Sequence, residues 1–406
     1  MMGSPNAGKL KKGFGEVAKT AVPYFAQWTF NEPLIIRPET DAILNKIQKL
    51  LYKAVIHFGN EYRNYLHLVP FSDEILNLLA FYKDRPYQPN LYRPDFLIDE
   101  ANKVRLIEIT CRFPLNGIFI SGFFNTITEK YVSERPYLTH VNHYQTLFDY
   151  LMDYIGNFEH ICYLIGDEQR NESKYALPIF EKAGFKVYTL SPGEIPQNLH
   201  LLRNAAVFNE LNSSELFSLP ENAFHALIDA GMMNDLRTVF LIHDKRFFSL
   251  FQKNEFLQNI FTPEEQAFIS EHIVPTYTSI ETPDLWQEAK NNKDSWIIKN
   301  SSRGKSIDVY AGIVIEEQEW QRLFSGDNLK NMILQPYVKQ RKFPGYLNDK
   351  FYNDYIVGII LMYNDQYFGP GVVRASSFPI TNRVDDRKFA PLVTKDYIFF
   401  DERIII

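Results

Sequence analysis

A stretch in the middle of the chain alternates short apolar runs with segments of helical spacing, and this alternation limits the possible folds more than any other feature. Strands that alternate with helices are typical of a parallel sheet with helices on its faces, because each crossover returns over the sheet. The alternation therefore predicts a Rossmann-like layer over about residues 151–240. Its predicted strands are 160–166, 186–190 and 205–209, and its predicted helices are 171–183 and 221–230.

The sequence before this layer predicts helices and one pair of strands. A polar run separates two strands that mix apolar and charged residues, and such a run is typical of a hairpin turn. We therefore expect the two strands to pair antiparallel. The predicted helices are 42–57, 69–82 and 117–131, and the predicted strands are 93–97 and 104–110.

The last third of the chain predicts helices followed mostly by strands. Thr262 with Glu265 three residues later is a capping-box pattern, so a helix should begin at Pro263. Asn364-Asp365 lies between two apolar runs and predicts a hairpin. These elements indicate an α+β region with a sizeable antiparallel sheet. The helices are 245–252 and 263–272, and the strands are 296–299, 306–310, 332–335, 355–363, 366–374 and 397–406.

The length of 406 residues fits two or three domains of roughly 100–200 residues each. We predict an N-terminal helical region with the strand pair over 1–150. The Rossmann-like domain follows over 151–240. The α+β region covers 241–406.

Composition excludes several classes of protein. Hydrophobic residues make up 45% and charged residues 23%, which is ordinary for a folded chain and unlike a disordered one. The net charge of −6 argues against a general nucleic-acid binder. No run approaches about 18 apolar residues, so we expect no membrane span. Met1–Phe14 lacks the apolar core of a signal peptide, so we interpret it as a mobile leader. With only Cys111 and Cys162, the chain fits a reducing, cytoplasmic location.

A strand that ends in Lys299 leads into a small polar loop, Asn300–Ser306. Nucleotide chemistry needs backbone N–H groups near phosphate oxygens and a lysine to offset their charge. The strand end offers the lysine, Lys299, and the loop offers backbone groups at Ser301, Ser302 and Gly304. The Walker A pattern is absent. The alternative is a plain hairpin with a solvated basic tip.

Charged residues also lie on the predicted strand pair. Arg93 and Asp95 share one face of their strand, and Glu108 and Thr110 share one face of theirs. A hairpin would bring Asp95 and Glu108 together, and two carboxylates on rigid strands suit Mg²⁺ with substrate phosphates. The alternative is a cross-strand charge cluster on a solvated face.

Three further positions are candidates for a nucleotide site. Arg374 ends a strand and can grip a phosphoryl group or a carboxylate at two points, or else form a surface ion pair. Gln335 and Tyr337 flank a proline where a strand can expose backbone groups to adenine, although proline also simply ends strands. Lys245 opens a helix with Asp244 as the N-cap, which is also how an ordinary helix starts.

Taken together and in chain order, these motifs resemble an ATP-grasp ligase whose elements are circularly permuted. Similar arrangements occur in glutathionylspermidine synthetase and eukaryotic-type glutathione synthetase. The resemblance covers about residues 90–132 and 235–395. It departs at Thr110, where the family has an Asn that helps to hold a metal. The motifs are Arg93-Pro-Asp95, Glu108-Ile-Thr110, His243–Phe251, Thr262–Thr276, Trp296–Lys299 with Gly304, Leu334–Val338 and Gly371–Ser376.

The resemblance implies an α+β and α/β chain with an ATP-grasp fold, and a ligase that joins a carboxylate to an amine through an acyl phosphate. It implies ATP and Mg²⁺ as cofactors. Its site residues would be Lys245 and Lys299 on the phosphates, the loop residues Ser301, Ser302 and Gly304 closing over them, Gln335 and Tyr337 at adenine, Asp95, Glu108 and Thr110 on the metal, and Arg93 and Arg374 on the transferring group.

Two other functions stay open at this point. The substitution at Thr110 favours a nucleotide- or metabolite-binding protein without catalysis, and a phosphotransferase could use the same fold. For a ligase, we expect amino acids or peptides to supply the carboxylate and the amine. We expect neither nucleic acid nor a membrane as a partner, and the sequence leaves the oligomeric state open.

Overall fold

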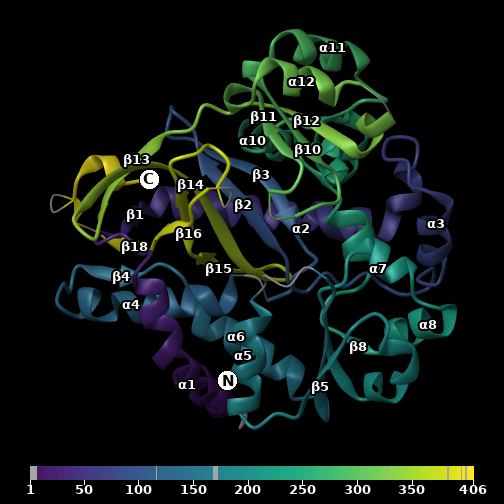
Figure 1. Ribbon diagram of the computed structural model, residues 1–406, viewed down its shortest axis with the longest axis horizontal. Helices are drawn as coiled ribbons and strands as arrows, with labels where there is room; N and C mark the ends of the chain where they lie inside the picture. Colours follow the sequence, from purple (N-terminus) through teal and green to yellow (C-terminus); the bar gives the residue numbers. More distant parts are fainter. Residues whose placement is uncertain are drawn as a thin grey trace.

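The structure of the protein is a computed structural model that describes residues 7–115, 117–167, 172–304, 306–325, 327–381, 384–394, 396–397 and 400–406. Helices and strands mix along the chain, and the strands of the described residues form four sheets (Figure 1). The mixed α and β class expected from the sequence is therefore confirmed. In the described part of the chain, no helix is both long and apolar enough to cross a bilayer.

The largest sheet has seven strands built around β14, which pairs with β13, β15, β16 and β2. The hairpin of β2 and β3 is confirmed, and its register places Asp95 opposite Glu108. Helices α2, α3, α9 and α10 belong to the same part of the molecule as this sheet. The strands are β2 (Arg93–Ile98), β3 (Val104–Thr110), β13 (Lys342–Leu347), β14 (Lys350–Tyr363), β15 (Gln366–Pro370), β16 (Val373–Ser376) and β17 (Arg387–Phe389), and the helices are α2 (Pro38–Glu61), α3 (Asp73–Ala80), α9 (Asn254–Ile260) and α10 (Pro263–His272).

A second, antiparallel sheet of four strands forms a small lobe that Figure 1 shows beside α11 and α12. Its own apolar core contains Trp286, Trp320 and Leu334. The lobe therefore packs largely around itself. Its elements are β9 (Tyr277–Thr278), β10 (Trp296–Asn300), β11 (Val309–Ala311), β12 (Met332–Pro336), α11 (Pro283–Asn291) and α12 (Glu317–Leu323).

The third sheet is parallel, with the strand order β6-β5-β7-β8, and confirms the predicted Rossmann-like layer. Cys162 on β5 and Cys111 are both buried and free, so no disulfide joins them. The boundaries of the three predicted regions stay a prediction. The elements here are β5 (His160–Leu164), β6 (Val187–Leu190), β7 (Ala205–Asn209), β8 (Gly231–Met232), α4 (Ile118–Ser133), α5 (Tyr144–Ile155), α6 (Ser173–Lys182), α7 (Ser213–Phe217) and α8 (Glu221–Asp229).

The expected mobile leader is wrong for the residues that the structure describes. Residues from Ala7 onward form helix α1 (Ala7–Ala26), which packs on α4, α5 and α6 (Figure 1). Leu10 and Phe14 are buried on its inner face, and Phe14 stacks on Phe123. The reason is that apolar residues recur in this segment at helical spacing, which a search for a signal peptide overlooks. Residues 1–6 lie outside the described residues.

The expected C-terminal strand over 397–406 is also wrong in its described part. A short 3₁₀ helix covers Glu402–Ile404, because Arg341 captures the backbone carbonyls of 402, 403 and 405 with its guanidinium. Residues 398 and 399 lie outside the described residues. The fourth sheet is small and has three strands, β1 (Leu34–Ile36), β18 (Pro391–Thr394) and β4 (Leu138–His140).

Three further elements differ in detail from their predictions. The segment 366–374 splits into β15 and β16, because the Val372 N–H donates to the Ser121 hydroxyl at 3.1 Å instead of extending the sheet. Strand β11 begins only at Val309, since Ser306 and Asp308 have positive φ angles. The predicted helix 245–252 is a 3₁₀ helix with Asp244 as its N-cap, and the capping box before α10 is confirmed.

Candidate functional site

Eight of the twelve site residues predicted from the sequence line one pocket. The pocket lies between the seven-stranded sheet, which contributes β2, β3, β14 and β16, and the small lobe, which contributes β10, β11 and β12. Its cavity volume is about 90 Å³, which is small beside typical ligand pockets. The eight residues are Asp95, Glu108, Lys245, Lys299, Gly304, Gln335, Tyr337 and Arg374.

The predicted residues that do not line the pocket are Arg93, Thr110, Ser301 and Ser302. Arg93 stands directly behind the wall, where it bonds to Asp95 and lies 3.4 Å from the Thr110 hydroxyl. Ser301 is buried, and its backbone bonds to Lys245 and Asn331. The roles of all twelve residues stay predictions.

One half of the pocket is apolar. Ile107 on β3 and Ile297 on β10 are among the side chains that form its walls, and the segment after β12 forms its edge. The Gln335 amide is tied inward, since it donates to the Thr276 hydroxyl at 2.8 Å. Tyr337 donates its backbone N–H to the Ser295 carbonyl, and burial raises the pKa of its phenol to about 12. Apolar walls with a few oriented polar groups suit a flat ring such as a purine.

Two lysines stand at the polar half of the pocket. Lys245 and Lys299 are 6% and 5% exposed, and burial lowers the pKa of each while Glu108 acts to raise it. The Lys299 ammonium lies 3.7 Å from the Glu108 carboxylate, and the Lys245 ammonium donates to the Arg303 carbonyl at 2.5 Å. Two buried cations that share one carboxylate favour an anionic ligand.

Asp95 sits between two arginines that come from strands on either side of β14. Arg93 donates to both of its oxygens, at 2.7 and 2.9 Å, and Arg374 donates to Oδ2 at 2.5 Å. Arg93 is on the same face because it lies two residues away on β2, while Arg374 reaches over from β16 across β14. Burial acts to raise the pKa of Asp95, but the two guanidinium groups outweigh it and the pKa is lowered.

As they are placed, Asp95, Glu108 and Thr110 do not fit a magnesium ion. Both oxygens of Asp95 already accept from guanidinium groups, Glu108 faces Lys299, and the Thr110 hydroxyl lies next to Arg93. Mg²⁺ demands near-ideal octahedral coordination, which nearby guanidinium groups oppose. Within the described ranges, no group of three or more His, Cys, Asp or Glu side chains could hold a metal.

The loop after β10 has a different hydrogen-bond pattern from the expected phosphate cradle. The Asn300 side chain accepts from the backbone N–H groups of both Ser302 and Arg303, at 3.1 Å each. These two N–H groups therefore point at a side chain of the protein. The Arg303 side chain and Gly304 line the pocket. Lys305 lies outside the described residues.

Sequence reasoning missed two basic residues beside the site. Arg112 is buried, and its guanidinium would lie 3.9 Å from a Cβ atom placed on Gly304. Burial lowers the pKa of Arg112 to about 10. Arg303 lines the pocket but was considered only as part of the loop. The available signals were the place of Arg303 within the predicted phosphate loop and the place of Arg112 two residues after Thr110. His243 is buried, and the Cys111 N–H donates to its Nδ1.

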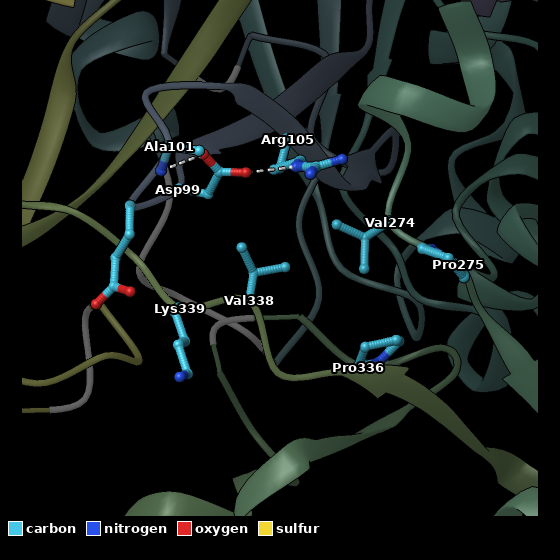
Figure 2. A pocket seen from close by; sticks show the side chains of 9 residues that line it. Asp99, Ala101, Arg105, Val274, Pro275, Pro336, Val338 and Lys339 are labelled. Carbon is cyan, nitrogen blue, oxygen red and sulfur yellow. Dashed lines mark hydrogen bonds and ion pairs between the residues drawn. The ribbon is translucent and has the colours of Figure 1, made fainter. Parts of the chain in front are cut away.

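A second pocket, of about 380 Å³, lies on the other side of the segment that follows β12. Figure 2 draws Val274, Pro336 and Val338 among its lining side chains, and these three residues also line the first pocket. In the same view, Arg105 pairs with Asp99 at 2.8 Å. The segment 336–338 therefore separates two cavities.

Comparisons with known proteins show a likeness of fold. The family described as the AnkG N-terminal domain matches residues 47–241. No curated protein matches the sequence. Among solved structures, a glutathione synthetase-like effector from Globodera pallida, solved in its apo form, matches this chain at 13% identity and a TM-score of 0.54.

That match covers 96% of this chain and 99% of the effector chain. A structure assigned as a γ-glutamylcysteine synthetase from Methylobacillus flagellatus matches with 12% identity, 86% coverage of both chains and a TM-score of 0.32, which is too low to support an argument. Over nearly its whole length, the chain therefore has the fold of the glutathione synthetase-like effector.

Proposed function

We propose that the protein is an ATP-dependent ligase of the ATP-grasp type that joins a carboxylate to an amine. The observation that carries this proposal is the single pocket lined by eight residues that the order of motifs had assigned to a nucleotide site. The residues come from segments near 100, 245, 300, 335 and 374, so chance proximity in the sequence does not explain their meeting. The fold shared with a glutathione synthetase-like effector supports the proposal.

In the proposed reaction, the γ-phosphoryl group of ATP moves to a substrate carboxylate, which gives an acyl phosphate and ADP. The amine then attacks the acyl carbon, the C–N bond forms, the C–O bond to phosphate breaks, and the amine loses a proton. Lys245 and Lys299 hold the phosphates, and Arg374, fixed by Asp95, meets the charge of the transferring group. Catalysis here is mainly positioning and charge stabilisation.

We further propose that the carboxylate and the amine belong to amino acids or peptides and that the protein acts in the cytoplasm. Two buried, free cysteines are compatible with a reducing compartment. The proposal includes no nucleic-acid or membrane partner.

The test is a ligand screen followed by an assay of turnover. Specific binding raises the melting temperature, so ATP with pools of amino acids, polyamines and peptides identifies the substrates. ADP release that requires both a carboxylate and an amine supports the ligase. ADP release without the amine would indicate a phosphotransferase instead.

A nucleotide-binding protein without ligase activity is the second candidate. The engagement of Asp95 by Arg93 and Arg374 favours it, because this carboxylate is not free to bind a catalytic metal. ATP binding with no ADP release for any substrate pair would decide for this candidate.

A further inference from the structure

The charges that line the nucleotide pocket favour an anion over a metal ion. Four of the described lining side chains are cationic, Lys245, Lys299, Arg303 and Arg374, and two are anionic, Asp95 and Glu108, so the lining carries a net charge of +2. Phosphate groups need positive charge around them, and in many nucleotide sites a divalent ion supplies part of it. Here side chains already supply a surplus.

Both carboxylates of the pocket are paired with cationic side chains. Asp95 is 1% exposed, and its two oxygens accept three hydrogen bonds from Arg93 and Arg374. Glu108 is the more open of the two, at 26% exposed, but its nearest cation is Lys299 at 3.7 Å. A metal ion placed between the two carboxylates would have to displace guanidinium groups from a buried position, which is costly.

The loop after β10 also leaves phosphate binding to side chains. The backbone N–H groups of Ser302 and Arg303 donate to Asn300, and the Lys245 ammonium holds the Arg303 carbonyl. These contacts hold the loop backbone, and the Arg303 side chain lines the pocket while it is 59% exposed and pairs with Asp308 at 3.4 Å. A guanidinium can bind two phosphate oxygens at once.

We propose that this pocket binds the phosphates of a nucleotide directly through side-chain cations, so that binding does not depend on a divalent metal ion. The inference rests on the proposed nucleotide site and departs from the magnesium expected from the sequence. It assigns Arg303 as a phosphate-binding residue beside Lys245 and Lys299.

Calorimetric titration with ATP, once in excess Mg²⁺ and once in excess EDTA, tests the inference. The expected dissociation constants agree within about threefold, which is under 1 kcal/mol. A loss of affinity of about tenfold or more in EDTA would overturn the inference and leave the nucleotide site intact. Failure to bind ATP in either solution would contradict the proposed function itself.

Substitution of Glu108 separates the two roles by the sign of the effect. If Glu108 only balances the charge of Lys299, then Glu108→Gln removes a negative charge from an anion site and strengthens ATP binding in EDTA. If Glu108 holds a metal, the same change weakens ATP binding in Mg²⁺, whatever its effect in EDTA. The second result would contradict the inference.

Arg303→Gln tests the cation assigned to the phosphates. It removes the guanidinium but keeps the backbone carbonyl that Lys245 holds, so the loop should stay in place. We expect ATP binding in EDTA to weaken about tenfold, the size of a charge-assisted hydrogen bond, and adenosine binding to stay unchanged. Lys339→Ala, an exposed lysine outside this pocket, is the matched control and should change neither. Unchanged ATP binding by Arg303→Gln would remove Arg303 from the site.

Discussion

At the scale of single residues, Asp95 fixes one arginine that lines the pocket and one that stands behind its wall. Its carboxylate is almost fully buried and accepts from Arg93 and Arg374. The two arginines come from strands on opposite sides of β14, so Asp95 also ties β2 to β16. The side chain is therefore structural as well as electrostatic.

Asp95→Asn should lower the free energy of unfolding by about 3–5 kcal/mol, because it leaves two buried guanidinium groups without a counter-charge. The folded-state pKa of Asp95 is lowered, so its stabilisation is present above its ordinary pKa of 3.8 and is lost as the pH falls through the folded value. Urea unfolding of both proteins at neutral and acidic pH measures the effect. A variant as stable as the parent at neutral pH would contradict it.

Lys299→Met should weaken ATP binding by about 1.5–3 kcal/mol, because it removes a charge-assisted contact and keeps the aliphatic stem. The fold should persist, since Lys299 lies at the strand end and pairs only loosely with Glu108. Calorimetry with ATP measures the change, and circular dichroism checks the fold. Equal affinity in parent and variant would show that Lys299 does not touch the phosphates.

At the scale of elements, helix α4 begins at a carboxylate from a distant segment. Glu172 is buried and accepts the backbone N–H groups of Gly117 and Ile120 at the first turn of the helix. Burial raises the pKa of this carboxyl to about 8, although these N–H groups act to lower it. The helix start therefore depends on the protonation of one side chain.

Between the ordinary Glu pKa of 4.5 and the folded value of about 8, the folded state binds more protons than the unfolded state. The free energy of unfolding should therefore fall as the pH rises through this window. Glu172→Gln cannot lose a proton, so its stability should vary less with pH. Denaturant unfolding at several pH values compares the two, and equal slopes in parent and variant would refute the role of Glu172.

Helix α1 gives an element-scale test of the corrected N-terminus. Phe14→Ala should cost about 3–5 kcal/mol of stability, because the ring stacks on Phe123 in a core. Lys11→Ala, on the exposed face of the same helix, should cost little. Thermal unfolding of both variants measures the difference, and a mobile leader would predict no effect from either.

At the scale of the whole molecule, the proposed nucleotide pocket lies between two bodies with separate cores. The small lobe has its own apolar cluster around Trp320, and the large cluster joins residues as distant as Leu44, Val207 and Ile356. ATP would contact both bodies, so it should slow amide hydrogen exchange in the lobe over 277–336 more than in β14. Exchange followed by mass spectrometry checks this, and equal protection throughout would argue against a ligand between the two bodies.

Local patterns were sufficient to predict most strands, whereas the residues that meet in the pocket were brought together only by the resemblance to a ligase family. Strands β7 and β10 and the hairpin of β2 and β3 follow from short apolar runs, because strand formation and turns are encoded by neighbouring residues. The partner of Asp95 was not predictable in this way, since Arg374 lies 279 residues away in the sequence. The metal expectation depended on that missing partner.

The 279 residues that separate Asp95 from Arg374 in the sequence have a consequence for synthesis on the ribosome. Domains form as the chain emerges, from the N-terminus onward. The hairpin of β2 and β3 leaves the ribosome long before β14 and β16, so Asp95 has only Arg93 as a partner until residue 374 has been translated. A nascent chain that stops earlier lacks a wall of the pocket and one of its cations. Truncated translation products should therefore not compete with the finished protein for nucleotide.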